Sequence, residues 1–215
     1  MTKKAVAPLT AVSDDRLPLR ERQRQQRRKG LIDAAREVFY ETLYVAATVE
    51  DIIQRAEISR PTFYRYFSDK DAVLREILLE DVTAQSAMWQ KLAAIGAPTD
   101  RQLFDWSQRF VNAMRKHART VALFSVATGM DPSLVHEFSR CRDHYLAILG
   151  TGIKAFRLKG DGSKRETERR AAAHLLFYQL DQICLNLAFP GSDLDESVML
   201  SAFVWNFRHF LDTQD

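Results

Sequence analysis

Apolar residues recur at intervals of three and four along almost the whole chain, which is the spacing of one face of an α-helix. Turn residues and candidate caps divide this pattern into segments that each have the length of a helix. The expected helices cover residues 31–39, 49–56, 60–67, 69–94, 101–117, 120–128, 132–156, 164–188 and 194–212. The pattern therefore predicts an all-α fold, with an N-terminal three-helix helix-turn-helix domain followed by a C-terminal helical domain.

Three candidate helix caps follow one another closely, at Thr48, Ser59 and Ser68. Thr48 and Ser68 each have an aspartate three residues later, which is the spacing of a capping box. Ser59 is followed by Pro61 in the first helical turn, where the missing N–H of proline does no harm. Caps this close together require short helices that meet at sharp angles, and this arrangement is typical of a helix-turn-helix.

Residues 60–67 form the second helix of the predicted pair. On a helical wheel of about 100° per residue, Phe63 and Phe67 share one face, which must be buried. Pro61 and Arg65 lie roughly opposite. An exposed face of this composition suits the major groove of DNA, where side chains reach base edges and phosphates. The alternative interpretation is a short helix of an ordinary all-α core, whose polar face meets only water.

The helix-turn-helix segment and its flanks also carry a set of residue types at fixed spacing. These residues are Ile32, Ala34, Ala35, Phe39, Tyr44, Thr48, Val49, Ile52, Ala56, Ile58, Ser59, Thr62, Phe63, Tyr64, Tyr66, Phe67, Lys70 and Leu74. With them, roughly residues 27–80 resemble the DNA-binding domain of the TetR family of transcriptional regulators. The family favours glycine at three positions that hold Leu43, Glu57 and Pro61 in this chain.

The resemblance implies a homodimer that places one recognition helix of each subunit in successive major grooves of a double-stranded, palindromic DNA operator. The residues expected to contact this DNA are Thr48, Arg60, Pro61, Thr62, Tyr64, Arg65, Tyr66 and Lys70. Arg60, Thr62 and Arg65 are expected to lie nearest the base edges. The phosphate contacts are expected from Thr48, Tyr64, Tyr66 and Lys70.

Positive charge is concentrated towards the N-terminus. The whole chain has a net charge of +3, yet residues 1–30 alone carry 9 Lys and Arg against 3 Asp and Glu. Such an excess beside a DNA-reading unit favours the attraction of phosphates, although a solubilising tail has the same composition. The stretch 20–29 is interpreted either as a basic arm that enters a minor groove or as a solvated extension of the first helix.

The expected domain organisation has three parts. Residues 1–22 are polar and aperiodic and are expected to form a disordered basic tail. Residues 23–75 are assigned to the DNA-binding domain, and residues 76–215 to a ligand-binding and dimerisation domain. The long helix expected at 69–94 contributes to both domains and is therefore a candidate mechanical connector.

Composition restricts the class of protein further. The hydrophobic content of 46%, with 8 glycines and 6 prolines, favours a helical chain with a substantial core. No apolar run approaches the ~18 residues needed to span a bilayer, and an apolar signal segment is lacking, so a cytoplasmic location is expected. Cys141 and Cys184 lie in apolar helical patterns and are expected to be core thiols rather than a disulfide.

The last two helices, 164–188 and 194–212, are apolar on more than one side. A helix with such a wide apolar surface must bury two faces. Packing both helices against the same helices of a second subunit buries the extra face, and the TetR resemblance implies the same four-helix interface.

A sensing site for a small apolar or aromatic molecule is expected in the middle of the chain, with few hydrogen bonds to the ligand. Its expected lining is a set of aromatic and sulfur side chains at helical spacing, together with two charged residues embedded in apolar faces. The candidates are Trp106, Phe110, Met114, Phe124, Phe138, Arg142, Tyr145, Phe177, Tyr178 and Asp181. For any single aromatic residue of this set, plain core packing is the alternative.

No pattern in the sequence favours catalysis. The five histidines show no metal-ligand spacing, and a glycine-rich phosphate loop, a nucleophile elbow and a cysteine pair at zinc spacing are all missing. We therefore expect no catalytic residues, no metal and no cofactor. The sequence predicts a homodimeric, ligand-responsive transcriptional repressor. The alternatives are a helical interaction protein whose helix-turn-helix no longer reads DNA, and a small-molecule enzyme on an all-α scaffold.

Overall fold

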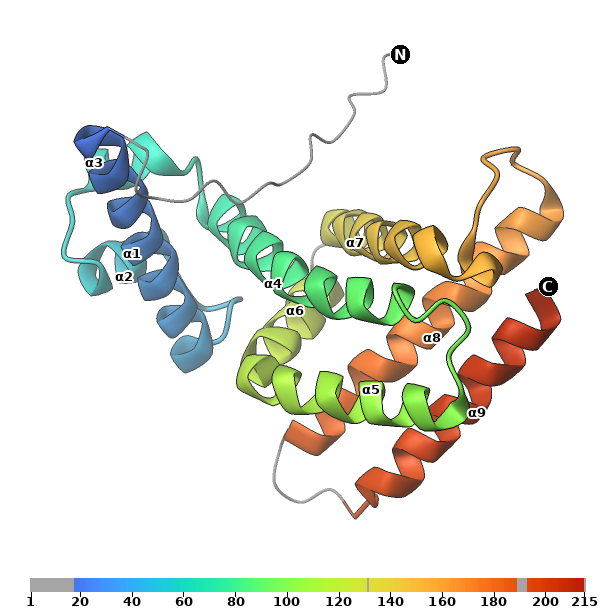
Figure 1. Ribbon diagram of the computed structural model, residues 1–215. Coiled ribbons are helices and arrows are strands. Elements are labelled where there is room, and N and C mark those ends of the chain that lie inside the picture. Colours follow the sequence, from blue (N-terminus) through green and yellow to red (C-terminus); the bar gives the residue numbers. More distant parts are fainter. Residues whose placement is uncertain (1–17, 131, 189–192, 215) are drawn as a thin grey trace. The chain divides into compact units, whose positions relative to one another are not determined.

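The computed structural model describes residues 18–130, 132–188 and 193–214, and these residues form helices joined by short loops, without strands (Figure 1). The α-helices are α1 (Leu19–Thr42), α2 (Val49–Arg55), α3 (Arg60–Tyr66), α4 (Lys70–Ala93), α5 (Asp100–Met114), α6 (Ala118–Met130), α7 (Pro132–Gly152), α8 (Lys164–Ala188) and α9 (Glu196–Gln214). Two short 3-10 helices are η2 (Arg115–His117) and η3 (Lys154–Phe156). The prediction of an all-α fold that begins with a helix-turn-helix is confirmed.

Helix α1 begins much earlier than the apolar pattern predicts. It starts at Leu19, directly after Pro18, and continues through the polar stretch 20–29 to Thr42. Arginine and glutamine are good helix formers, so the packed second half of α1 can carry a solvated first half. Residues 19–22, which the sequence pattern assigns to a disordered tail, are therefore helical, and the stretch 20–29 is no extended arm. The remainder of that expected tail, residues 1–17, lies outside the described residues.

The chain divides into two compact units, and the division falls after Thr83, inside α4. The first unit has a core of side chains from α1, α2, α3 and the start of α4. Its largest fully buried members are Phe39, Ile52, Phe63, Leu74 and Ile77. The unit continues beyond residue 75 because Glu76 and Glu80 of α4 each form an ion pair of 2.6 Å with an arginine of α1.

The second unit contains the C-terminal part of α4 and the helices from α5 onward. Helix α9 packs against both α8 and α5, and Figure 1 shows α8 and α9 as neighbours. Phe203 and Phe207 of α9 and Phe156 of η3 are almost fully buried at these contacts. Both helices thus bury one apolar face within the second unit.

A close approach of two backbones ends α7 earlier than the sequence pattern predicts. A Cβ atom at Gly152 would lie 1.8 Å from the carbonyl oxygen of Ala93, at the end of α4. Only glycine fits at such a distance. The chain leaves the helix at Ile153, whose ψ of 114° is extended, and η3 follows as a separate short turn.

We expect Gly152→Ala to destabilise the second unit by about 1–3 kcal/mol or more, because the new methyl group must push two backbones apart. Gly129→Ala is the matched control, since Gly129 is also helical and a Cβ atom added there would meet nothing within 4 Å. Urea unfolding of the two variants measures the difference. Equal unfolding midpoints would contradict the close approach of α4 and α7.

Candidate nucleic-acid interface and sensing core

The helix-turn-helix is fixed by side-chain caps at the start of each helix. Thr48 and Asp51 form the expected capping box of α2: the Asp51 amide donates to the Thr48 hydroxyl at 3.2 Å, and the Thr48 amide donates to the Asp51 carboxylate at 2.8 Å. The Ser59 hydroxyl accepts a hydrogen bond from the Thr62 amide at 3.4 Å at the start of α3. These bonds satisfy amides that a helix start leaves without partners, so they set where α2 and α3 begin.

The cap of α4 differs from the predicted one. The carboxylate of Asp69 accepts a hydrogen bond from the Ala72 amide at 2.7 Å, whereas Ser68 donates its hydroxyl to Asp69 at 2.8 Å. Asp69 is therefore the capping residue, and Ser68 orients it. The amide of Ala72 and the hydroxyl of Ser68 lower the pKa of Asp69, in that order of effect, so the cap stays ionised.

Helix α3 is oriented by its two phenylalanines, as the sequence predicts. Phe63 is completely buried and Phe67 is 4% exposed. The opposite side of the helix meets solvent: Arg60, Pro61 and Arg65 are exposed. The direction in which α3 presents its polar side chains is therefore decided by the first unit's core.

The polar residues of α3 differ in how freely they can reach a ligand. Arg60 forms an exposed ion pair of 3.3 Å with Glu50 and lies 5.8 Å from the centre of the Tyr64 ring. The Arg65 guanidinium lies 5.4 Å from the Tyr66 ring. Within residues 18–130, Arg65 has no ion-pair partner. A surface pair such as that of Arg60 contributes little stability, so both guanidinium groups are available to DNA.

The structure gives Lys70 a role that the sequence analysis did not predict. Its ammonium donates to the carbonyl oxygens of Tyr44 and Ala47 at 2.9 Å each, and approaches that of Val45 at 3.4 Å. It also lies 4.7 Å from the centre of the Tyr44 ring. An ammonium has three donors, and here all three point to the loop between α1 and α2. The expected phosphate contact by Lys70 therefore competes with a contact inside the unit.

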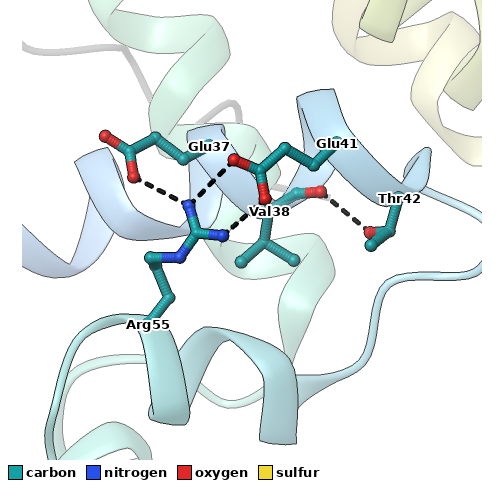
Figure 2. Close-up of polar contacts among 5 residues, drawn as sticks. All are labelled: Glu37, Val38, Glu41, Thr42 and Arg55. Carbon is teal, nitrogen blue, oxygen red and sulfur yellow. Dashed lines mark hydrogen bonds and ion pairs between the residues drawn. The ribbon is translucent and has the colours of Figure 1, made fainter.

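Helices α1 and α2 are joined by a second charged contact, which Figure 2 shows. The guanidinium of Arg55, at the end of α2, donates to Glu37 at 2.9 Å and to Glu41 at 3.1 Å. Both carboxylates lie on α1, one turn apart. Hydrogen bonds from these carboxylates, Glu41 first, raise the pKa of Arg55 above its ordinary value. Sequence analysis missed this contact, although the i, i+4 spacing of the two glutamates was a possible signal.

Two residues of the helix-turn-helix adopt positive φ angles, Leu43 at 62° and Glu57 at 52°. They are the non-glycine residues with this backbone among the residues the structure describes. Both are positions at which the resemblance implies glycine, so this chain keeps the backbone path and accepts the strain. The backbone of Leu43, with φ of 62° and ψ of 142°, lies in a region of φ/ψ space that residues other than glycine seldom enter.

Comparison with known proteins agrees with this geometry. Residues 31–77 match the family model described as "Bacterial regulatory proteins, tetR family". A segment of 109 residues is 32% identical to the HTH-type transcriptional repressor Rv1474c of Mycobacterium tuberculosis, covering 49% of this chain and 54% of that protein. A longer segment is 25% identical to the regulator EthR of Mycolicibacterium smegmatis, covering 71% and 72% of the two chains. Residues 31–77 thus form a DNA-binding domain of the TetR family.

The fold extends this similarity along the chain. The crystal structure of Thermus thermophilus FadR, a TetR-family transcriptional repressor in complex with lauroyl-CoA, matches with a TM-score of 0.57 and 20% identity, covering 86% of this chain and 93% of that one. The family model and the relatives are those of transcriptional regulators, which agrees with the prediction that the chain is not an enzyme. The matched segment spans about half of the Mycobacterium tuberculosis repressor.

Most of the expected ligand-binding residues lie in the interior of the second unit. The buried ones are Trp106, Phe110, Met114, Phe124, Tyr145 and Phe177. Phe138 is half-buried, with its ring 5.1 Å from that of Phe124, whereas Tyr178 is 44% exposed on α8. The structure thus gathers four of the aromatic candidates in one cluster, forms a separate pair from Phe124 and Phe138, and leaves Tyr178 on the surface.

Trp89 of α4 is the centre of this aromatic cluster, and sequence analysis did not include it in the site. Its ring contacts those of Trp106, Phe110, Tyr145 and Phe177 at centroid distances between 4.7 and 5.8 Å. Trp106 donates its indole N–H to the carbonyl of Met88 at 3.0 Å. The indole N–H of Trp89 is buried and, among the described residues, has no hydrogen-bond partner. An unpaired buried donor costs on the order of 1–3 kcal/mol.

The two charged candidates pair with each other. Arg142 of α7 donates to Asp181 of α8 at 2.8 Å, and its guanidinium lies 3.8 Å from the centre of the Tyr178 ring. Arg142 is 8% exposed, and its Nε atom has no partner among the described residues. A ligand group at this point would therefore meet a guanidinium with a donor to spare.

Neither a metal site nor a membrane span is found in the described parts of the chain. Within them, His, Cys, Asp and Glu side chains do not gather in groups of three that could hold a metal ion. None of the described helices combines the length and the apolar character needed to cross a bilayer. Cys184 is buried with a free thiol, and burial raises its pKa.

We expect Lys70→Met to lower the free energy of unfolding of the first unit by about 1–2 kcal/mol, because charge-assisted bonds to the α1–α2 loop are lost. Its direct effect on DNA binding should be small: the slope of log affinity against log salt should stay as in the wild type. Urea unfolding and salt titrations check the two parts. A slope reduced by about one unit, with unchanged stability, would restore Lys70 to the phosphate contacts.

Proposed function

We propose that this TetR-family protein is a homodimeric transcriptional repressor, which a mainly apolar small molecule releases from a palindromic DNA operator. The observation that supports this most directly is the orientation of α3, with Phe63 and Phe67 buried and Arg60 and Arg65 exposed. A helix held in this way presents its donors to the major groove. The repressor function named for the Mycobacterium tuberculosis relative supports the direction of regulation.

The contacts to DNA divide by their geometry. Arg65 and Arg60 are the candidates for base edges, since a guanidinium can bond two acceptors of guanine at once. Tyr64 and Tyr66 flank the exposed face of α3 and are candidates for phosphates, as is Thr48 before the start of α2. The Thr48 hydroxyl also donates within the capping box at 2.7 Å, so a phosphate would compete with the cap for this donor.

The DNA-binding proposal is tested by selecting binding sites from a random duplex library with the full-length protein. Arg65→Ala should relax the preference at particular base pairs and weaken binding to the selected site by about 1–3 kcal/mol, since a bidentate base contact is lost. Arg101→Ala is the matched control, because it removes an exposed arginine from α5 in the second unit. A uniform loss of affinity without relaxed preference would show that Arg65 contacts phosphate instead.

Dimerisation is proposed through the outer faces of α8 and α9. After each helix has packed inside the subunit, large apolar side chains remain exposed on both: Leu175 at 66%, Val198 at 66% and Trp205 at 70%. Tyr178 lies one turn after Leu175 and is also exposed. A second subunit that covers these faces with its own copies forms a two-fold symmetric four-helix interface.

Trp205→Glu is expected to shift the protein towards the monomer, because a buried, unpaired carboxylate opposes association. Leu79→Glu is the control: Leu79 is also an exposed apolar residue, at 43%, but it belongs to α4 in the first unit. Sedimentation velocity over a range of concentrations measures the equilibrium. A wild-type chain that remains monomeric throughout would refute the dimer, and equal behaviour of both variants would place the interface elsewhere.

A mainly apolar ligand is proposed because the interior of the second unit is apolar, rich in aromatic rings and poor in polar atoms. The unpaired indole N–H of Trp89 and the Nε of Arg142 are donors, so the ligand would present hydrogen-bond acceptors to them. The lauroyl-CoA bound by FadR of Thermus thermophilus, which has the same fold, is a ligand with a long apolar part.

The proposed release from DNA follows from the thermodynamic linkage between ligand binding and DNA binding. A ligand changes DNA affinity only if it binds better to the conformation that does not fit the operator. Helix α4 supplies Trp89 to the aromatic cluster and Val73, Leu74 and Ile77 to the core below α3. A ligand that displaces the Trp89 ring therefore acts on a helix that also belongs to the DNA-binding unit.

A second candidate function is that of a helical interaction protein that no longer reads specific DNA. It is favoured by Glu57, whose exposed carboxylate stands in the turn between α2 and α3 where the family favours glycine. The library selection separates the two candidates. Recovery of no sequence preference and no salt-dependent binding would support the interaction protein and overturn the repressor.

A further inference from the structure

The first half of α1 carries a basic stripe on a defined side of the helix. Arg20, Arg24 and Arg27 follow one another at intervals of four and three residues, and the same series continues four residues later at Leu31. Leu31 is 2% exposed and belongs to the first unit's core. Residues spaced in this way share one face of a helix. One face of α1 is therefore apolar and buried in its second half, and basic and exposed in its first half.

The C-terminal end of this stripe lies beside α3. Arg27 lines a surface hollow together with Thr62 and Tyr66 of α3. The next residue, Arg28, lies 5.0 Å from the ring of Phe67, directly after α3. Both observations place the middle of α1 next to the C-terminal half of α3, within the same compact unit. A phosphate that flanks the groove occupied by α3 is thus within reach of this side of α1.

The stripe is also free to bind an anion. Within residues 18–130, Arg20 and Arg27 have no ion-pair partner, and Arg24 has a loose pair of 3.9 Å with Glu21. Arg28, by contrast, is held by Glu76 at 2.6 Å. Acidic residues of the hollow are occupied in part by other groups, since Asp33 pairs with Arg36 and Glu37 with Arg55. Glu57 is the third acidic residue of the hollow and is exposed, so the uncompensated positive charge lies along α1, at Arg20 and Arg24 as well as Arg27.

We propose that Arg20, Arg24 and Arg27 form a second DNA contact, which binds the phosphate backbone beside the site of α3. This inference rests on the proposed DNA-binding function and adds to it a helical phosphate-binding surface outside the helix-turn-helix. The contact is independent of base sequence, because the arginines lie on a solvated helix whose side chains have no packing to fix them. It extends the footprint of each subunit along the backbone and strengthens the salt dependence of binding.

The opposite side of the same helical segment provides a matched control. Arg22 and Lys29 lie roughly 140–180° away from the stripe on a wheel of about 100° per residue, and both are exposed. Arg24→Ala/Arg27→Ala and Arg22→Ala/Lys29→Ala each remove two positive charges from residues 20–29. Alanine is the best helix former, so both variants keep α1 helical, which circular dichroism verifies.

The experiment measures the affinity of the full-length protein for a random-sequence DNA duplex by fluorescence anisotropy, between about 50 and 200 mM salt. Arg24→Ala/Arg27→Ala should reduce the slope of log affinity against log salt by about 0.9 for each lost contact, hence by roughly two units for each subunit that contacts the duplex. The control variant should change the slope by less than half of that. Because the two variants have the same net charge, the difference between their slopes depends only on where the removed charges lie on the helix.

The outcomes separate the inference from the function on which it rests. A larger loss in the stripe variant supports the second contact. Equal losses in both variants overturn it, because the segment then acts only through its total charge. If the wild type shows no salt-dependent binding to duplex DNA, the proposed DNA-binding function itself fails, and the contact fails with it.

Discussion

The burial of Phe63 and Phe67 is the constraint on which the DNA-binding unit depends. Helix α3 has only seven residues, and a helix of this length is not stable alone in water. Burying a phenylalanine side chain contributes about 1.5–3 kcal/mol, so the two rings hold the helix to the unit and also fix its rotation. The Ser59 cap fixes where the helix begins. Once the first residue and the rotation of α3 are fixed, Arg60 and Arg65 must lie on its exposed side. No further interaction is needed to place them there.

The loop between α1 and α2 shows how this chain offsets backbone strain. Leu43 replaces a glycine that the family favours, and its backbone conformation costs on the order of 1–3 kcal/mol. Tyr44 and Ala47 follow Leu43 in the chain, and Lys70 donates hydrogen bonds to their carbonyl oxygens. The amide of Ala47 in turn donates to the Leu43 carbonyl at 3.0 Å. Hydrogen bonds from a charged donor are stronger than neutral ones, so together they offset part of this strain. The lysine is therefore a structural part of the loop before it is a possible DNA ligand.

The parts of this structure that depend on local pattern were predictable from sequence. The inward face of α3 and the cap at Thr48 follow from residues within one or two helical turns. The backbone of Leu43 was not predictable in this way, because a leucine at a position where the family favours glycine suggests a different path for the turn, whereas Leu43 keeps a positive φ. Contacts between distant residues left no such signal. The main partners of Lys70 lie 26 and 23 residues earlier in the chain, and Trp89 became the centre of a cluster only through the crossing of helices. The helical first half of α1 was missed for another reason: periodicity detects only buried faces, and this segment buries none.

The difference in burial between the two basic helices also determines what each can recognise. Base readout requires donors that are held in defined positions relative to the acceptors of the bases, and α3 meets this condition because Phe63 and Phe67 anchor it on the core side. The first half of α1 has no such anchor, because its arginines at positions 20, 22, 24 and 27 are exposed and no core packing fixes their side chains. Such side chains cannot discriminate between bases. They can follow phosphates, which repeat along every sequence, and the attraction needs only proximity and charge. The anchored helix is therefore suited to specificity, and the solvated one to affinity.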